Sequence, residues 1–278
     1  LLREEVGESA FRQGVKDFLR AHSYSNARVD DFLKALEKAS GTSLSGFRKT
    51  WLESTVFPED LAMAYLKKHS ESVKKYLELQ QREASGTRLS ETEIATAWNT
   101  YDSPEFRSHL LKTFRPVLSS DFLERVCREG SLPVQKAFLE TTVTLRDWMV
   151  TMVEGWLDAP SYDLREASLF RLWVGVPEKR KQYLERVVKN GSLSNLRLQQ
   201  FWWLLAVITE GYAGTDKKQT YMDQLRSTTA PSFSWETRMN AFSMLREIGA
   251  LSRQNLQDLM QATEHHSWQF KKFARNLL

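Results

Sequence analysis

The sequence lacks several features that would assign it to a class of protein at once. It has a single cysteine in 278 residues, which excludes a disulfide within the chain. Its longest apolar run, residues 201–208, is far shorter than the roughly 20 residues needed to span a bilayer. The first residues do not have the pattern of a signal or transit segment. We therefore predict no membrane span, and the compartment stays open between the cytoplasm, the periplasm and the outside of the cell.

Strong charge of one sign is missing as well. The formal net charge is +4, and basic residues alternate with acidic ones instead of forming blocks. Because a nucleic-acid surface normally gathers its Lys and Arg into a patch, no nucleic-acid partner is predicted. Apolar residues make up 41% of the sequence, which is enough for a buried core and argues against disorder along the whole chain.

Motifs of self-contained catalysis are also absent. The sequence has no Gly-x-Ser-x-Gly turn and no glycine-rich phosphate loop. No histidine is followed by glutamate, so the zinc signature His-Glu-x-x-His does not occur. The five histidines are His22, His69, His109, His265 and His266. The last two are adjacent and point in different directions on a helix, so we interpret them as residues that favour a helix C-terminus.

Cys127 lies in a helical pattern of apolar residues, so we expect a small core side chain there and not a nucleophile. We predict no catalytic residue, no metal ligand and no cofactor within this chain.

Helical periodicity is what the sequence has in abundance. Apolar residues recur at spacings of three and four through most of the chain, and strand-like alternation is nearly absent. Most prolines fall between these segments or in their first turns, where a missing N–H costs little. Pro116 is predicted to mark a break between two helices. The predicted fold class is all-α.

A repeat begins near residue 102. Helical segments start at serines spaced by 28, 30, 33, 40 and 33 residues, and a serine at such a place can cap a helix. A second helical pattern follows each of several of them, as at 181–188, 218–225 and 254–260. Helical pairs at such periods predict a stacked superhelix of the HEAT type, an α-solenoid. The serines are Ser103, Ser131, Ser161, Ser194, Ser234 and Ser267.

A row of arginines accompanies these serines at spacings of three or four, consisting of Arg107, Arg165, Arg197 and Arg238. Equivalent positions of a solenoid line up, so the four guanidinium groups are predicted to follow one face. We expect them to pair with acidic side chains between repeats. The alternative is that the row faces a substrate or binds an acidic partner.

Residues 1–58 follow a different pattern, with predicted helices at 1–22, 29–40 and 44–52. A further pair at 59–69 and 71–83 leads to a segment at 91–100 that opens the repeat region. The chain has no initiator Met and starts within a helical pattern. We therefore expect the polypeptide to begin upstream of Leu1.

The first region carries a family resemblance. Its residues run Phe11-Arg12-Gln13-Gly14-Val15, then Phe18, His22, Tyr24, Asp31-Phe32, Leu36, Phe47 and Trp51, and end at Phe57-Pro58. This order resembles the end of the catalytic domain in zinc aminopeptidases of the aminopeptidase N (gluzincin) family. The resemblance implies that residues 1–58 end a catalytic domain and that residues 59–278 form a C-terminal HEAT-like domain.

The resemblance also implies what lies elsewhere. The zinc motif, its distal glutamate, the catalytic tyrosine and the Gly-x-Met-x-Asn motif would all belong to an upstream catalytic domain, the partner of this chain. Zinc is thus expected in the longer protein, with peptides as substrates. The helical part would cover the active site and limit access to it. Many members insert a small β-sandwich after this segment, whereas helices follow Pro58 here, as in a shorter or divergent branch.

Two other interpretations remain open from the sequence. A non-catalytic HEAT-like scaffold that binds another protein would explain the repeats equally well. An inactive relative of the peptidase would retain the architecture for binding alone.

Overall fold

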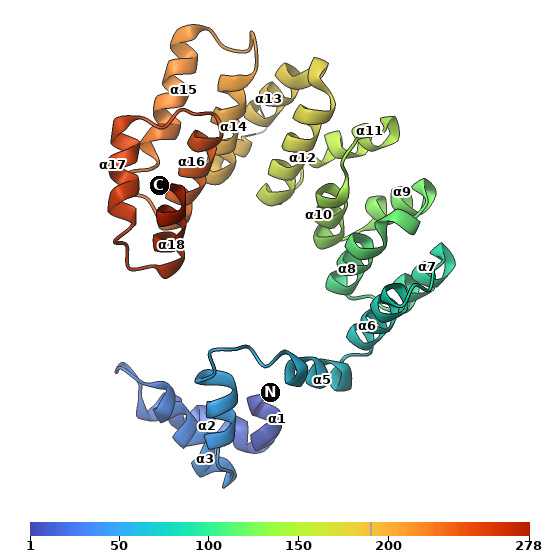
Figure 1. Cartoon of the computed structure of the whole chain (residues 1–278), viewed down its shortest axis with the longest axis vertical. Helices are drawn as coiled ribbons and strands as arrows, with labels where there is room; N and C mark the ends of the chain where they lie inside the picture. Colours follow the sequence, from blue (N-terminus) through green and yellow to red (C-terminus); the bar gives the residue numbers. More distant parts are fainter. Residues whose placement is uncertain (190) are drawn as a thin grey trace. The chain divides into compact units, whose positions relative to one another are not determined.

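The computed structural model describes residues 1–189 and 191–278, and within these residues it contains helices and no β-strand (Figure 1). The predicted all-α class is confirmed. The chain divides into two compact units, unit 1 at Leu1–Arg88 and unit 2 at Leu89–Leu278. The domain boundary that we predicted after Pro58 was placed where the family resemblance ends. It stays a prediction. No helix in the described part is long and apolar enough to cross a bilayer.

Unit 1 starts with two helices where one was predicted. Gly7 separates them with φ 81°, a backbone conformation that side-chain-bearing residues avoid. The segment predicted at 44–52 is a single turn of α-helix that runs into a π-helix. The helices of unit 1 are α1 (Leu2–Val6), α2 (Glu8–Ala21), α3 (Val29–Ser40), α4 (Ser45–Phe47), the π-helix η1 (Arg48–Leu52), α5 (Glu59–His69) and α6 (Glu71–Ala84).

The packing of α2 against α3 forms the core of unit 1. Leu36 of α3 is fully buried, together with Leu33 and Leu44. Gly14 lies directly above Leu36, because a Cβ built on it would be only 2.7 Å from Leu36 Cδ2 and 3.1 Å from the Ala35 carbonyl oxygen. The two helices can therefore approach this closely only because residue 14 has no side chain.

Unit 2 contains the predicted pairs of helices, and Pro116 lies in a short 3-10 turn between two of them, as predicted. Its helices are α7 (Glu91–Thr100), α8 (Pro104–Phe114), η2 (Arg115–Val117), α9 (Ser120–Glu129), α10 (Leu132–Thr141), α11 (Asp147–Trp156), α12 (Tyr162–Gly175), η3 (Pro177–Lys179), α13 (Arg180–Lys189), η4 (Ser192–Ser194), α14 (Leu196–Ile208), α15 (Thr215–Ser227), α16 (Trp235–Glu247), α17 (Arg253–Ala262) and α18 (Trp268–Leu277).

From α8 onward, each even-numbered helix of unit 2 packs against the next even-numbered helix. Contacts join α8 to α10, α10 to α12, α12 to α14, α14 to α16 and α16 to α18. These six helices, which we call the inner row, follow one another in Figure 1, with α9 and α11 along one side. Large fully buried side chains pack between successive members, for example Phe242 of α16, whose ring stacks on that of Phe270 of α18 with 6.3 Å between centroids. Each helix pair is therefore covered by its neighbours, as a helical stack requires.

The predicted serine caps start most helices of the inner row. The hydroxyl oxygens of Ser103, Ser161, Ser234 and Ser267 each accept a hydrogen bond from the backbone N–H three residues later, at 3.2, 3.4, 3.3 and 3.5 Å. There are two exceptions: the Ser131 side chain makes no cap bond at the start of α10, and at α14 the Asn195 side chain, not that of Ser194, accepts from the Leu198 N–H at 3.1 Å. These starts are set by local sequence, which is why the spacing of serines predicted them.

We predict that Gly14→Ala destabilises unit 1 by about 1–3 kcal/mol, since the new methyl group would force α2 away from α3. Hydrogen exchange of α2 and α3 amides would become faster. The matched control is Gly46→Ala, because nothing lies within 4 Å of a Cβ at Gly46. Equal exchange in the two variants would contradict this account of the α2–α3 contact.

Candidate functional site

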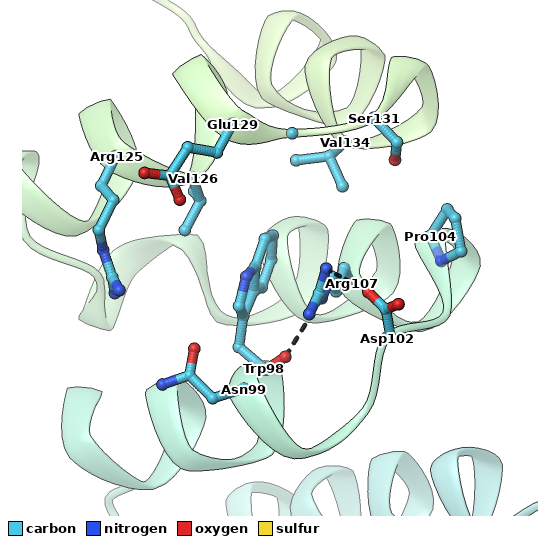
Figure 2. Close-up of a pocket in the computed structure, with 11 residues that line it drawn as sticks. Trp98, Asn99, Asp102, Pro104, Arg107, Arg125, Val126, Glu129, Ser131 and Val134 are labelled. Atoms are coloured by element: carbon cyan, nitrogen blue, oxygen red, sulfur yellow. Dashed lines mark hydrogen bonds and ion pairs between the residues drawn. The ribbon is translucent and has the colours of Figure 1, made fainter.

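A pocket of about 500 Å³ lies among α7, α8, α9 and α10 of unit 2 (Figure 2). It contains one of the four predicted arginines, Arg107. The lining residues are Trp98, Asn99, Asp102, Pro104, Arg107, Arg125, Val126, Glu129, Gly130, Ser131 and Val134.

Trp98 and Arg107 form one wall of this pocket. Trp98 ends the buried face of α7, and its ring meets the Phe122 ring edge to face at 5.6 Å. Arg107 lies in the first turn of α8, and its Nε donates to the Trp98 carbonyl oxygen at 3.1 Å, as Figure 2 shows. The Arg107 guanidinium also lies 5.5 Å from the Trp98 ring centroid and 2.8 Å from an Asp102 oxygen. Arg107 is thus held by the protein itself and its charge is balanced.

Arg125 and Glu129 of α9 form the opposite wall, where both side chains are exposed. The Arg125 guanidinium lies 5.2 Å from the Phe122 ring centroid, which fixes its position without neutralising it. Arg125 also lines a second hollow of about 480 Å³ beside Glu91 and Asp121. The surface around α7 and α9 therefore offers hydrogen-bonding groups of both charges. These groups can form hydrogen bonds and ion pairs with a polar ligand.

The other three predicted arginines do not line this pocket. Arg165 Nε donates to the Ala159 carbonyl oxygen, and Arg238 Nε donates to the Thr229 carbonyl oxygen at 2.8 Å. Arg107, Arg165 and Arg238 thus share one role: each reaches back from the first turn of its helix to a backbone carbonyl just upstream. The serine four residues before each of them is the sequence signal that could have predicted this contact.

Arg197 differs from these three. It is 58% exposed and forms an ion pair with Glu166 of α12, with Arg197 Nε 2.9 Å from a Glu166 oxygen. This is the pairing between repeats that we expected for the whole row. Capture of an acidic ligand by the row stays a prediction.

The sequence did not reveal a series of ion pairs along the inner row. Lys112 of α8 pairs with Glu140 of α10 at 2.5 Å, and Lys136 of α10 pairs with Asp163 of α12 at 3.0 Å. The ammonium group of Lys136 lowers the pKa of Asp163. The Glu166 pair with Arg197 continues the series, although burial raises the pKa of Glu166 more than Arg197 lowers it. The pairs are partly exposed, so each contributes at most about 1 kcal/mol.

Arg238 and His265 lie in a polar region between α16, α17 and α18, where Arg238 is buried and His265 is partly exposed. Arg238 is 3% exposed, and its Nη2 donates to the Asp258 carbonyl oxygen at 3.1 Å. His265 Nδ1 accepts from the Ser267 N–H at 3.0 Å, at the start of α18. The sequence placed His265 at a helix C-terminus, whereas its ring supports the N-terminus of the next helix. Burial lowers the pKa of His265, and the positive charges of His266, Arg238 and Lys271 lower it further.

The structure brings together no three metal-ligating side chains of His, Cys, Asp or Glu within residues 1–189 and 191–278. Cys127 is fully buried, and desolvation raises its pKa to about 12, so its thiol is protonated at neutral pH.

Residues of the family-like segment contact one another within unit 1. The Phe18 and Phe32 rings meet edge to face at 5.1 Å, which joins α2 to α3. The Trp51 ring lies 6.3 Å from that of Phe47 and 6.2 Å from that of Phe57. Together with Gly14 above Leu36, these contacts show that the residues carrying the resemblance hold the segment together.

Comparison with known proteins finds the same resemblance. The Peptidase family M1 domain matches residues 1–51. Aminopeptidase N of Lactococcus lactis subsp. lactis is 40% identical over 58 residues, which are 21% of this chain and 7% of that protein. Aminopeptidase N of Streptomyces lividans is 45% identical over 49 residues, 18% of this chain and 6% of that protein. Glutamyl aminopeptidase of Bitis rhinoceros is 33% identical over 58 residues, 21% of this chain and 6% of that protein.

The first part of the chain is therefore similar to the aminopeptidase N family, as its residues predicted, and the likeness is confined to that part. The matched segment spans less than a tenth of the length of these relatives. No solved structure matches the chain.

We predict that Arg238→Ala costs about 2–4 kcal/mol of stability, because it leaves two buried carbonyl oxygens without their donor. Arg197→Ala should cost less than about 1 kcal/mol, since its ion pair is exposed to water. Denaturant unfolding followed by tryptophan fluorescence measures both. A cost for Arg197→Ala as large as that for Arg238→Ala would show that the two arginines have the same role.

The stability of unit 2 should fall as the pH drops below about 6.5, the ordinary pKa of histidine. The pKa of His265 is lowered in the folded chain, so the unfolded chain takes up its proton first. His265→Asn keeps an acceptor for the Ser267 N–H and does not titrate. Its melting temperature should therefore depend less on pH between about 5 and 7, whereas His22→Asn in unit 1 should leave the pH dependence of unit 2 unchanged. An unaltered slope in His265→Asn would rule this out.

Proposed function

We propose that this chain is the C-terminal part of a zinc-dependent aminopeptidase that removes N-terminal residues from peptides. In this proposal unit 2 covers the active site and limits the access of substrates. The observation that carries the proposal is the continuity of aminopeptidase-like sequence in residues 1–58 with a stack of paired helices. The partner of the chain would be an upstream catalytic domain of the same polypeptide.

The residues of this chain do not fit a zinc site. Zinc in hydrolases is held by three protein ligands drawn from His, Asp, Glu and Cys, and the described residues contain no such group. The proposal therefore assigns the metal and the reacting groups to the upstream domain, and it assigns no chemical step to any residue of this chain.

The pocket on α7–α10 supports a role in substrate access. Peptides carry amide groups and charged ends that need hydrogen-bond partners when they leave water. Asn99, Arg125 and Glu129 present such partners on the surface of one helical layer, next to the apolar edge of Trp98. A wall with these groups can select among peptides without taking part in the reaction.

A second candidate function is a non-catalytic scaffold that binds another protein along the inner row. The exposed apolar side chains of Phe170, Val174 and Ile208 on α12 and α14 favour this alternative. The Phe170 and Phe201 rings touch edge to face at 6.1 Å across these two helices. Apolar groups that neighbouring repeats leave exposed are typical of protein-binding surfaces.

Zinc content and the hydrolysis of aminoacyl anilides separate the two functions. We predict that the full polypeptide containing this chain binds about one zinc ion and hydrolyses these substrates. A chelator should abolish the activity, and added zinc should restore it. The 278-residue chain alone should show neither property. A full polypeptide that binds no zinc and cleaves no anilide would support the scaffold, and hydrolysis by the isolated chain would overturn the proposed division of roles.

A further inference from the structure

Two arginines of unit 2 share a region of the surface without a carboxylate partner. Arg115 lies in η2, directly after α8, and Arg146 lies at the N-cap of α11. Neither arginine takes part in an ion pair within residues 1–189 and 191–278. Other basic residues of unit 2 do, for example Lys112, Arg128 and Lys136. Two positive charges in one region are therefore left uncompensated.

Arg115 is held firmly with one donor group unused. Its Nη2 donates to Thr142 Oγ1 at 3.2 Å, and its guanidinium lies 4.6 Å from the centroid of the Phe138 ring. Its Nη1 is buried and has no hydrogen-bond partner. Burial lowers the pKa of Arg115, and the charge of Arg146 lowers it further. The geometry brings the two segments together, since Arg115 donates to Thr142, four residues before Arg146, and Arg146 donates to Ser120, five residues after Arg115. A buried cationic donor without an acceptor is costly, so such a group normally has one.

Trp148 provides a second unused donor beside the same ring. Its indole Nε1 is buried without a partner, and its ring lies 6.1 Å from the Phe138 ring, centroid to centroid. Trp148 is in the first turn of α11, two residues after Arg146. Arg146 itself is exposed, and its Nη1 donates to Ser120 Oγ at 2.6 Å. This bond positions the guanidinium group and leaves its other N–H groups available to a ligand.

We propose that Arg115, Arg146 and the Trp148 indole N–H form a binding site for an oxyanion, either a carboxylate or a phosphate group. In this proposal Arg115 Nη1 and Trp148 Nε1 supply the buried donors and Arg146 an exposed one, so the anion would approach from the side of Arg146. Guanidinium groups suit this ligand because their planar forks match two oxygens of a carboxylate or phosphate. The site is independent of the proposed peptidase function and lies outside the pocket on α7–α10.

The test uses the whole chain, with inorganic phosphate and acetate as probes at constant ionic strength. Each of the nine tryptophans gives one indole N–H signal in a nitrogen–proton NMR spectrum, and Trp148→Phe identifies the signal of Trp148. We expect this signal to shift saturably as a probe is added, while sodium chloride at the same ionic strength leaves it in place. Arg146→Gln should weaken binding about tenfold or more.

The controls separate the site from general charge effects. Arg128→Gln removes an exposed arginine of α9 that is already paired with Glu124, so binding should be unchanged. Arg146 is exposed, and its replacement should leave the chain folded even if Arg115→Gln does not. Saturation by phosphate alone identifies a phosphate site, and saturation by acetate identifies a carboxylate site. If neither probe shifts the signal saturably, or if Arg146→Gln binds as tightly as the original chain, the donors are met by water alone and the proposal is wrong.

Discussion

The burial of one apolar face per helix against the next helix is the constraint on which unit 2 depends. A single pair of helices leaves part of its apolar surface in water, so stability requires another pair on each side. Phe138 shows this requirement, since its fully buried ring in α10 is in contact with Trp148 and Trp156 of α11 and is covered by Arg115 after α8. Removing any one of these elements would expose the others.

Polar groups make this stacking specific. Serine hydroxyls cap four of the six helices of the inner row. Arg107 and Arg238, each four residues after such a serine, donate to carbonyl oxygens upstream of their helices. Ion pairs such as Lys136 with Asp163 add a weaker link between successive members of the row. Apolar packing thus provides most of the stability, and the polar contacts set the register of each helix.

The features that the sequence predicted correctly are those that depend on neighbouring residues. The cap at Ser234 and the start of α16 follow from four consecutive positions, and the start of α7 follows from a serine with glutamate three residues later. The break at Gly7 was missed because the apolar pattern continues through it. The partner of Arg197 and the second acceptor of Arg238, the Asp258 carbonyl oxygen, could not be predicted, since they lie 31 and 20 residues away. The same holds for Arg115 and Arg146, which only the fold brings together.

The residues that carry the family resemblance have a structural role here, as Gly14 and Phe18 show. Because a fold of this kind supports many functions, these residues alone do not establish a peptidase. The proposal that the chain belongs to a zinc aminopeptidase therefore depends on the residues that precede Leu1 in the polypeptide. It is tested most directly by sequencing the coding region upstream of Leu1. Our account predicts a zinc motif of the form His-Glu-x-x-His there, with a further glutamate after it. An upstream sequence that opens the reading frame without this motif would contradict the account and favour a scaffold.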